Sequence, residues 1–400
     1  MSTGLWAPLG TPDYRRLWLG QTVSVIGDKI DQIALGILVF EATGSGLQMG
    51  IMLAISMLPA ALFGMLAGAY VDRWDRRRTM IAADVVRAGL VLSVPFAIDV
   101  GLWLVYLIAL AVATVSLFFE PAKLSLIPDL VGSERLMAAN SLDSVSSSAS
   151  ELLGLAFAGG LVAAMGYRVA FFIDAATYLL SAVFILTIAY RTQPRERRGA
   201  SWRDVLREAT AGVRYIADEP VLRDLLVVYA AAMTGVAASV TFIYVLALDR
   251  FSAGAPGLAS LDAAITVGLL VGSFAVARSE LSRASRTLLV GLLVFASLFV
   301  VVAFAPSLVS LIPLFFLLGI ANMYFYVPMA AIVQSVAVPE MRGRALAAKQ
   351  VLSRALSVVG FVGAGFLVEQ LGITESILIF SGIVAAAALV GFTRPHLRAA

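Results

Sequence analysis

The 400-residue sequence predicts an all-α membrane protein with twelve transmembrane helices in two pseudo-symmetric six-helix bundles. First, 60% of the residues are hydrophobic and only 14% are charged, whereas a soluble protein carries about 25% charged residues. Second, apolar runs of about 20 residues recur along the whole chain, and each is long enough to cross a bilayer core as a helix. Third, the second half of the chain repeats features of the first half.

The expected helices follow one another with short polar connections, which excludes a soluble domain with a single anchor. They fall at 17–40, 46–71, 79–98, 102–122, 137–165, 168–190, 222–248, 257–277, 286–305, 308–335, 345–369 and 375–393. Arg15 and Arg16 lead into the first span without a small-residue cleavage site, so we expect no cleaved signal peptide. An even number of spans places both termini on one side of the membrane.

The distribution of the 29 Lys and Arg residues identifies that side as the cytoplasm, because cytoplasmic loops are enriched in positive charge. Arg168 and Arg250 alone lie in loops on the opposite side. Four more lie within the spans: Lys29, Arg87, Lys349 and Arg354. The rest lie on the side of the termini.

A polar stretch at 191–221 separates the two expected bundles, 1–190 and 222–400. Within it, apolar residues recur at helical spacing: Trp202, Val205, Leu206, Ala209, Val213 and Ile216. This pattern predicts an interfacial amphipathic helix. The alternative is a plain solvated linker.

The two halves align with each other. A shift of 206 residues places 134–166 on 340–372, with Gly154 on Gly360, and a shift of 208 places Gly64 on Gly272. The two shifts agree in order and nearly in offset, which indicates an internal duplication.

The sequence lacks the residues that several kinds of chemistry require. The chain has no cysteine and one histidine, His396, in the polar tail, so it has no disulfide and we expect no metal site or Ser-His-Asp arrangement. No GxxxxGK[ST] loop is present, so ATP is not expected to power the protein directly. We expect no cofactor and no enzymatic activity.

Charges within the spans are the strongest functional signal, because a charge at the bilayer centre costs about 2.5–3.5 kcal/mol. Such residues must be paired, protonated or exposed to water. The acids that carry this signal within the spans are Asp28, Asp31, Glu120, Asp143, Glu151, Asp174 and Asp262. They outnumber the four bases within the spans, which favours cationic ligands, although Lys349 and Arg354 keep anions possible.

The spacing of these acids predicts a proton-coupling site. Asp28 and Asp31 share one helix face, with Gln32 beside Asp28; two close carboxylates in a low dielectric cannot both ionise cheaply. In the fifth span Asn140, Asp143, Ser147 and Glu151 form one stripe. The candidates are Asp28, Asp31, Glu120, Asp143 and Glu151. The structural alternatives are an Asp28–Lys29 ion pair, hydrogen bonding by Glu151, and packing roles for Asp174 and Asp262.

Aromatic and methionine side chains predict an adaptable pocket for organic cations. The candidates are Gln32, Tyr229, Met233, Tyr244, Asn322, Tyr324 and Tyr326. Simple helix packing is the alternative reading of this stripe.

The stretch "GMLAGAYVDRWDRRR" (64–78) resembles the motif between spans two and three of the major facilitator superfamily. The matching residues are Gly64, Gly68, Asp72, Arg73, Arg76, Arg77 and Arg78. "LWLGQTVSVIGD" (17–28), "FFEPAKLSLIPDLV" (118–131), "FFIDAATYLLSA" (171–182) and "PEMRGRA" (339–345) resemble the drug:proton antiporter branch that includes macrolide and siderophore exporters. Two departures stand out: Asp75 replaces a glycine, and the fifth span lacks the proline of the Gly-Pro motif.

The resemblance implies alternating access by two parallel six-helix halves around a central cavity. It also implies that Asp72 docks on the start of the eleventh span as a latch, the alternative being that the loop charges only orient the chain. When the cytoplasmic side closes, an Asp143–Lys349 contact is expected, with Glu120–Arg354 as the competing pair.

Together these observations predict a proton-coupled exporter of lipophilic, cationic or zwitterionic small molecules in a bacterial inner membrane. We expect a monomer that contacts lipid, substrate and protons, and no nucleic acid. The alternatives are a siderophore, lysolipid or metal-ion exporter of the same fold and, in another class, a non-transporting membrane sensor.

Overall fold

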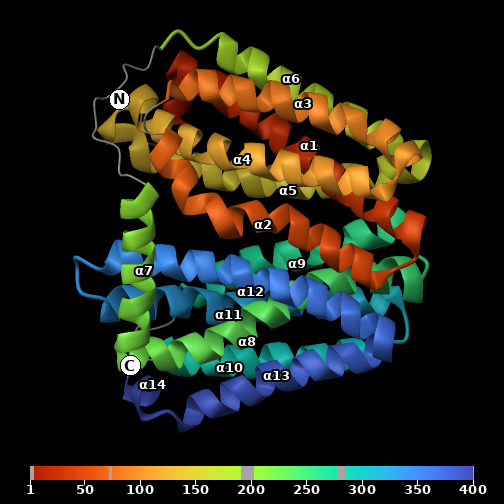
Figure 1. Cartoon of the computed structure of the whole chain (residues 1–400), viewed down its shortest axis with the longest axis vertical. Helices are drawn as coiled ribbons and strands as arrows, with labels where there is room; N and C mark the ends of the chain where they lie inside the picture. Colours follow the sequence, from red (N-terminus) through yellow and green to blue (C-terminus); the bar gives the residue numbers. More distant parts are fainter. Residues whose placement is uncertain (1–3, 72–73, 191–201, 278–283, 400) are drawn as a thin grey trace. The chain divides into compact units, whose positions relative to one another are not determined.

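The computed structural model describes residues 4–71, 74–190, 202–277 and 284–399, which are helical almost throughout and contain no strand (Figure 1). The elements are η1 (Ala7–Gly10), α1 (Pro12–Thr43), α2 (Gly46–Val71), α3 (Arg76–Val100), α4 (Leu102–Val131), η2 (Ser133–Arg135), α5 (Leu136–Met165), α6 (Tyr167–Leu186), α7 (Trp202–Asp218), α8 (Pro220–Tyr244), the π-helical turn η3 (Val245–Arg250), α9 (Gly254–Val276), α10 (Ala284–Ala303), α11 (Leu308–Val336), α12 (Arg342–Leu371), α13 (Ile373–Thr393) and α14 (Pro395–Ala399).

Within the described ranges, eleven helices are long and apolar enough to cross a membrane. The helix α1 is also long, at 32 residues, but it carries Asp28, Lys29 and Asp31 close together. The predicted all-helical membrane fold is confirmed.

The internal duplication appears in the starting positions of the helices. The helices α8, α9 and α10 each begin 208 residues after α1, α2 and α3, and α11, α12 and α13 each begin 206 residues after α4, α5 and α6. The two shifts seen in the sequence therefore describe two sets of six helices.

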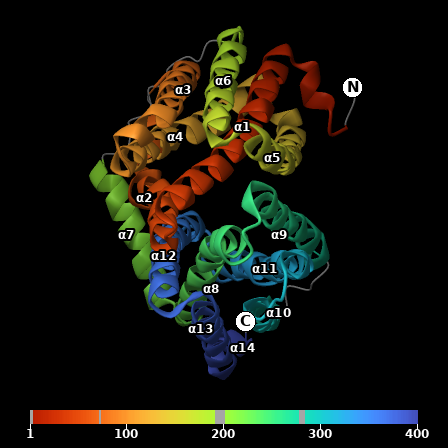
Figure 2. The ribbon, with the colours of Figure 1, turned by 90° about the vertical axis from the view of Figure 1, so that its right-hand side faces the viewer.

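The chain folds into two compact units. The first unit comprises Met1–Leu38 and Phe63–Trp202, and the second comprises Val39–Leu62 and Arg203–Ala400. The residues 39–62 thus group with the second unit, and the predicted bundle boundaries at 190 and 222 remain a proposal. In the first unit α3 packs against α4 and α6 (Figure 1). In the second unit the equivalent helix α10 packs against α11 and α13 (Figure 2).

Glycines allow one equivalent helix crossing in each unit. A Cβ atom on Gly154 of α5 would lie 2.7 Å from the Cβ of Lys29 on α1. A Cβ atom on Gly360 of α12 would lie 2.7 Å from the Cβ of Ala237 on α8. Lys29 and Ala237 are related by the 208-residue shift, and the two glycines by the 206-residue shift. The duplication therefore extends to the contacts between α1 and α5 and between α8 and α12.

The first half of α2 packs closely on α12 in the second unit. A Cβ atom on Gly365 would lie 2.7 Å from the Cα of Leu47, and one on Gly50 would lie 3.0 Å from the carbonyl carbon of Phe361. Small residues thus bring these two helix backbones together. The close approach predicted at Gly64 and Gly68 stays a prediction, because the side-chain surroundings of most residues from 65 to 70 lie outside the described part of the chain.

The linker contains the helix α7, which runs across the ends of α8, α11 and α12 (Figure 1), and its predicted interfacial role stays a prediction. Ile216 of its predicted apolar face is buried, whereas Val213 is 55% exposed. The Tyr215 hydroxyl accepts a hydrogen bond from the Val338 amide at 3.2 Å. The other apolar side chains predicted on this face lie outside the described residues.

Candidate functional site

In the first unit, an ion pair links α1 to α5 at the glycine crossing. The Nζ atom of Lys29 lies 3.1 Å from Oε1 of Glu151 and donates to Oε1 of Gln32 at 3.1 Å. Lys29 therefore pairs with Glu151, and the predicted alternative of an Asp28–Lys29 ion pair is not seen. The side chains are 21% and 39% exposed, so the pair contributes little to stability.

Asp28 accepts a hydrogen bond from Tyr178 of α6. The same Tyr178 ring lies 4.3 Å from the guanidinium of Arg87 on α3, and the ring of Phe119 on α4 lies 4.4 Å from that guanidinium. The guanidinium thus lies over two aromatic rings, a favourable arrangement for a partly desolvated cation. Four helices meet at this contact.

Arg87 also pairs with Asp84, one turn earlier on α3. The Asp84 side chain is fully buried and that of Arg87 is 6% exposed. Among the described residues, Oδ2 of Asp84 and Nε of Arg87 have no hydrogen-bond partner. Removing one partner of a buried ion pair leaves the other charge buried without compensation. The loss of either charge is therefore expected to destabilise this region.

Asp174 of α6 is buried against α1. Thr177 donates to its Oδ1 atom at 3.1 Å, and Oδ2 has no hydrogen-bond partner in the described part of the chain. The α1 backbone passes so closely that a Cβ atom on Gly27 would collide with Thr177 and Asp174. Asp31, which follows Asp28 by one turn on α1, has no ion-pair partner within the described ranges. The carboxylates Asp28, Asp31 and Asp174 therefore form an acid-rich interior on α1 and α6.

Between α4 and α5, one lysine forms ion pairs with two acidic residues. Lys123 lies 3.1 Å from Glu120 and 3.4 Å from Asp143. Asp143 is the predicted partner of a base of the eleventh span in the closed state and Glu120 is the competing partner, and here the two acids share a base of their own unit. In the second unit Arg354 donates to a backbone carbonyl of α2 at 3.1 Å. The predicted Asp143–Lys349 contact refers to a closed cytoplasmic side and remains a proposal.

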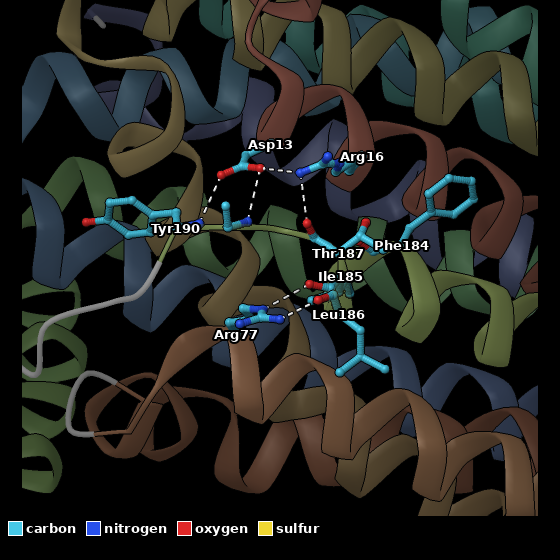
Figure 3. Close-up of polar contacts among 9 residues, drawn as sticks. Asp13, Arg16, Arg77, Phe184, Ile185, Leu186, Thr187 and Tyr190 are labelled. Carbon is cyan, nitrogen blue, oxygen red and sulfur yellow. Dashed lines mark hydrogen bonds and ion pairs between the residues drawn. The ribbon is translucent and has the colours of Figure 1, made fainter.

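The arginines of the family motif connect the start of α3 to its neighbours. Arg76 pairs with Asp129 of α4, and Arg77 donates to the carbonyl oxygens of Ile185, at 3.0 Å, and of Leu186 at the end of α6 (Figure 3). A cation at a helix C-terminus satisfies carbonyls that have no partner in the helix and complements the helix dipole. The motif arginines therefore have a structural role in addition to orienting the chain.

Two charged residues near the start of α1 also bind the segment that follows α6. Asp13 accepts hydrogen bonds from the amides of Ala189 and Tyr190, at 3.1 and 2.9 Å, and Arg16 donates to the carbonyl of Thr187 at 2.8 Å (Figure 3). Asp13 and Arg16 also pair with each other at 2.8 Å. The segment after α6 is thus held from both sides by charged side chains.

The sequence departure at Asp75 has a structural explanation. Its carboxylate accepts a hydrogen bond from the Arg78 amide at 2.9 Å and so caps the N-terminus of α3. Asp72 and Arg73 lie outside the described residues, and the latch that Asp72 was predicted to form stays a prediction.

The second unit holds a lysine among aromatic rings. The Nζ atom of Lys349 lies 4.8 Å from the ring of Tyr326 and 5.4 Å from the ring of Tyr229. Ser353, one turn further along α12, contacts the sulfur of Met233 at 3.2 Å. The predicted pocket residues on α8 and α11 therefore gather in part around α12.

The remaining predicted pocket residues are placed differently. Tyr324 packs against α10, where a Cβ atom on Gly291 would lie 2.9 Å from the Cβ of Tyr324. Asn322 and Tyr244 are buried within the second unit. Gln32 contacts Lys29 in the first unit.

Sequence reasoning did not select Tyr178, Phe119 or Lys123, although each contacts a residue that it did select. For Tyr178 a signal was present, because it follows Asp174 by one helical turn in "DAATY" and so shares its face. The described residues contain no cluster of three or more potential metal ligands.

These helices, with paired and unpaired charges inside duplicated six-helix sets, define a membrane transporter, and comparisons with known proteins agree. The profile of the family described as "Transmembrane secretion effector" matches residues 3–399. The chain is 29% identical to the multidrug efflux pump Tap of Mycolicibacterium fortuitum, covering 93% of each protein, and 25% identical to the MFS-type transporter YfiS of Bacillus subtilis, covering 91% of this chain and 88% of YfiS. Macrolide efflux protein A of Streptococcus pyogenes is 36% identical over 30% of each chain.

Among solved structures, the nucleoside transporter NupG superposes with a TM-score of 0.78, covering 96% of this chain and all of that one, at 14% identity. A bacterial homologue of the human lysosomal transporter Spinster superposes with a TM-score of 0.72, covering 96% of this chain and 97% of that one, at 15% identity. At such identities the likeness shows the fold alone. The chain belongs to the transmembrane secretion effector family of the major facilitator superfamily, and the predicted resemblance is confirmed.

Proposed function

We propose that the protein is a proton-coupled exporter of lipophilic, cationic or zwitterionic small molecules that works by alternating access. In this proposal it lies in a bacterial inner membrane as a monomer with both termini in the cytoplasm. The observation that carries the proposal is the surplus of carboxylates inside the first unit, where Asp28, Asp31 and Asp174 approach one another on α1 and α6.

The surplus of carboxylates inside the first unit has a direct chemical use. An ionised carboxylate in a desolvated interior attracts a cation strongly, and the same group releases the cation once it takes up a proton. Asp28 is the best placed for this exchange, since the partner that it has among the described residues is the neutral Tyr178 hydroxyl. Glu151 is the second candidate, because its bond to Lys29 is partly exposed and can be replaced. Competition between proton and cation for one group couples their movements.

Support for export, and for lipophilic substrates, comes from the relatives. Two of them are a multidrug efflux pump and a macrolide efflux protein. The tyrosines and methionine on α8 and α11 supply the adaptable apolar contacts that varied lipophilic molecules require.

The experiment is uptake of lipophilic cations into inverted membrane vesicles, with an imposed pH gradient and after its collapse. Ethidium, tetraphenylphosphonium and a macrolide would be compared with a lipophilic anion. Glu151→Gln and Asp28→Asn are expected to abolish gradient-driven uptake while the protein remains inserted and folded. Asp99→Asn is a matched control, since Asp99 is an exposed carboxylate that pairs with Arg168. Undiminished uptake by both interior variants would remove these carboxylates from the coupling role.

A further inference from the structure

A buried lysine in the second unit has no counter-charge among the residues that the structure describes. Lys349 is only 9% exposed, and within the described ranges no carboxylate lies at ion-pair distance from it. By contrast, Lys29 and Lys123 each have a carboxylate at 3.1 Å. The two tyrosine rings near Lys349 attract its charge but do not neutralise it. A buried charge without a partner is costly, so an anion bound beside Lys349 would stabilise it.

Lys349 also lines a cavity of about 20 Å³. Apart from Tyr229 and Lys349, its lining is aliphatic or thioether: Ile216, Leu222, Leu225, Leu226, Met329 and Val333. Lys349 is the only charged residue among them. The cavity has room for about one water-sized group. It can therefore hold only one end of a ligand.

We propose that this pocket binds the anionic group of a lipophilic acid, with Lys349 as its counter-charge. The ligand is a single carboxylate or phosphate on an apolar body, because the site offers one cation and an apolar wall. Ile216 contributes to that wall from α7, and the other residues come from α8, α11 and α12. A ligand here therefore bridges the linker helix and the three helices whose ends it crosses (Figure 1).

The inference goes beyond the proposed export of cations, and the site lies in the second unit, whereas the acid-rich interior lies in the first. It is tested by binding, without a pH gradient or transport. A failure of proton coupling leaves it standing, and its own failure leaves proton coupling standing.

The experiment uses the full-length protein in nanodiscs of neutral phosphatidylcholine, with decanoate as the probe. Decanol and decyltrimethylammonium match its chain length with a neutral and a cationic head. The chain has only three lysines, Lys29, Lys123 and Lys349, so mass spectrometry can follow acylation of each amine separately. Saturating decanoate is expected to slow acylation of Lys349 about fivefold or more and to leave Lys29 unchanged, whereas decanol and decyltrimethylammonium do neither.

Two variants separate a binding role from a structural one. Lys349→Met keeps the side-chain length and removes the unpaired charge, so its unfolding temperature is expected to rise by about 2 °C or more, and decanoate should no longer stabilise it. Lys349→Arg should retain stabilisation by decanoate. A second set of nanodiscs with phosphatidylglycerol identifies the source of the anion: protection of Lys349 without decanoate assigns a lipid headgroup, and its absence assigns a free acid.

Three results would overturn the proposal. The first is equal protection of Lys349 by decanol and decanoate. The second is undiminished stabilisation of Lys349→Met by decanoate. The third is a lower unfolding temperature for Lys349→Met, which would make Lys349 a structural residue.

Discussion

The glycine crossing between α1 and α5 gives a sharp test of the packing in the first unit. In Gly154→Ala, the new Cβ atom would lie 2.7 Å from the Cβ of Lys29 and 2.9 Å from the carbonyl oxygen of Ile26. Neither neighbour is the tip of a flexible side chain, so the helices must move apart. Overpacking of this kind costs about 1–3 kcal/mol, against a gain of about 1 kcal/mol in helix propensity.

Gly160→Ala on the same helix is the matched control, because nothing lies within 4 Å of the new Cβ atom. It gains the helix propensity without the collision. The free energy of unfolding of Gly154→Ala should therefore lie about 1–3 kcal/mol below that of Gly160→Ala. Equilibrium unfolding of both purified variants in mixed micelles, followed by tryptophan fluorescence, measures the difference. Equal stabilisation by the two substitutions would refute the close crossing.

Two further predictions concern charge pairs. Arg87→Met leaves the fully buried Asp84 without its base, so a loss of about 3–5 kcal/mol is expected. Adding Asp84→Asn should recover part of it in the same unfolding assay, and a double variant no more stable than the single one would contradict the pairing. For the proposed closed state, Asp143→Lys with Lys349→Asp should restore part of the efflux that either single change removes; a swap no better than the singles would reject the contact.

Much of the fold was predictable because the helix signal is strong and repeated. The composition, the apolar runs and the two sequence shifts predicted the helices and their duplication. The crossing at Gly154 and Gly360 illustrates why the shifts were informative, since equivalent glycines contact equivalent positions on α1 and α8. The grouping of residues 39–62 with the second unit was not predictable, because it depends on close contacts such as that of Gly50 with α12.

Sequence reasoning could predict which residues belong to the candidate site, but not which of them pair with one another. Periodicity places Asp28 and Asp31 on one face of a helix, but it does not specify which residue of another helix lies opposite. Lys29 was therefore considered with Asp28, its neighbour in sequence, whereas α5 presents Glu151 to it at 3.1 Å. In the same way, Asp143 meets Lys123 of its own unit. Tyr178 connects Asp28 to Arg87, and its position one helical turn after Asp174 was the sequence signal that pointed to it.

The most direct test of the central claim is proton release from the purified protein when a substrate binds. An exchanger whose interior carboxylate binds either a proton or a cation must release the proton when the cation arrives. In weakly buffered detergent solution with a pH indicator, tetraphenylphosphonium should acidify the medium for the wild-type protein but not for Asp28→Asn. Binding of tetraphenylphosphonium without proton release by the wild-type protein, or equal release by both proteins, would contradict the account.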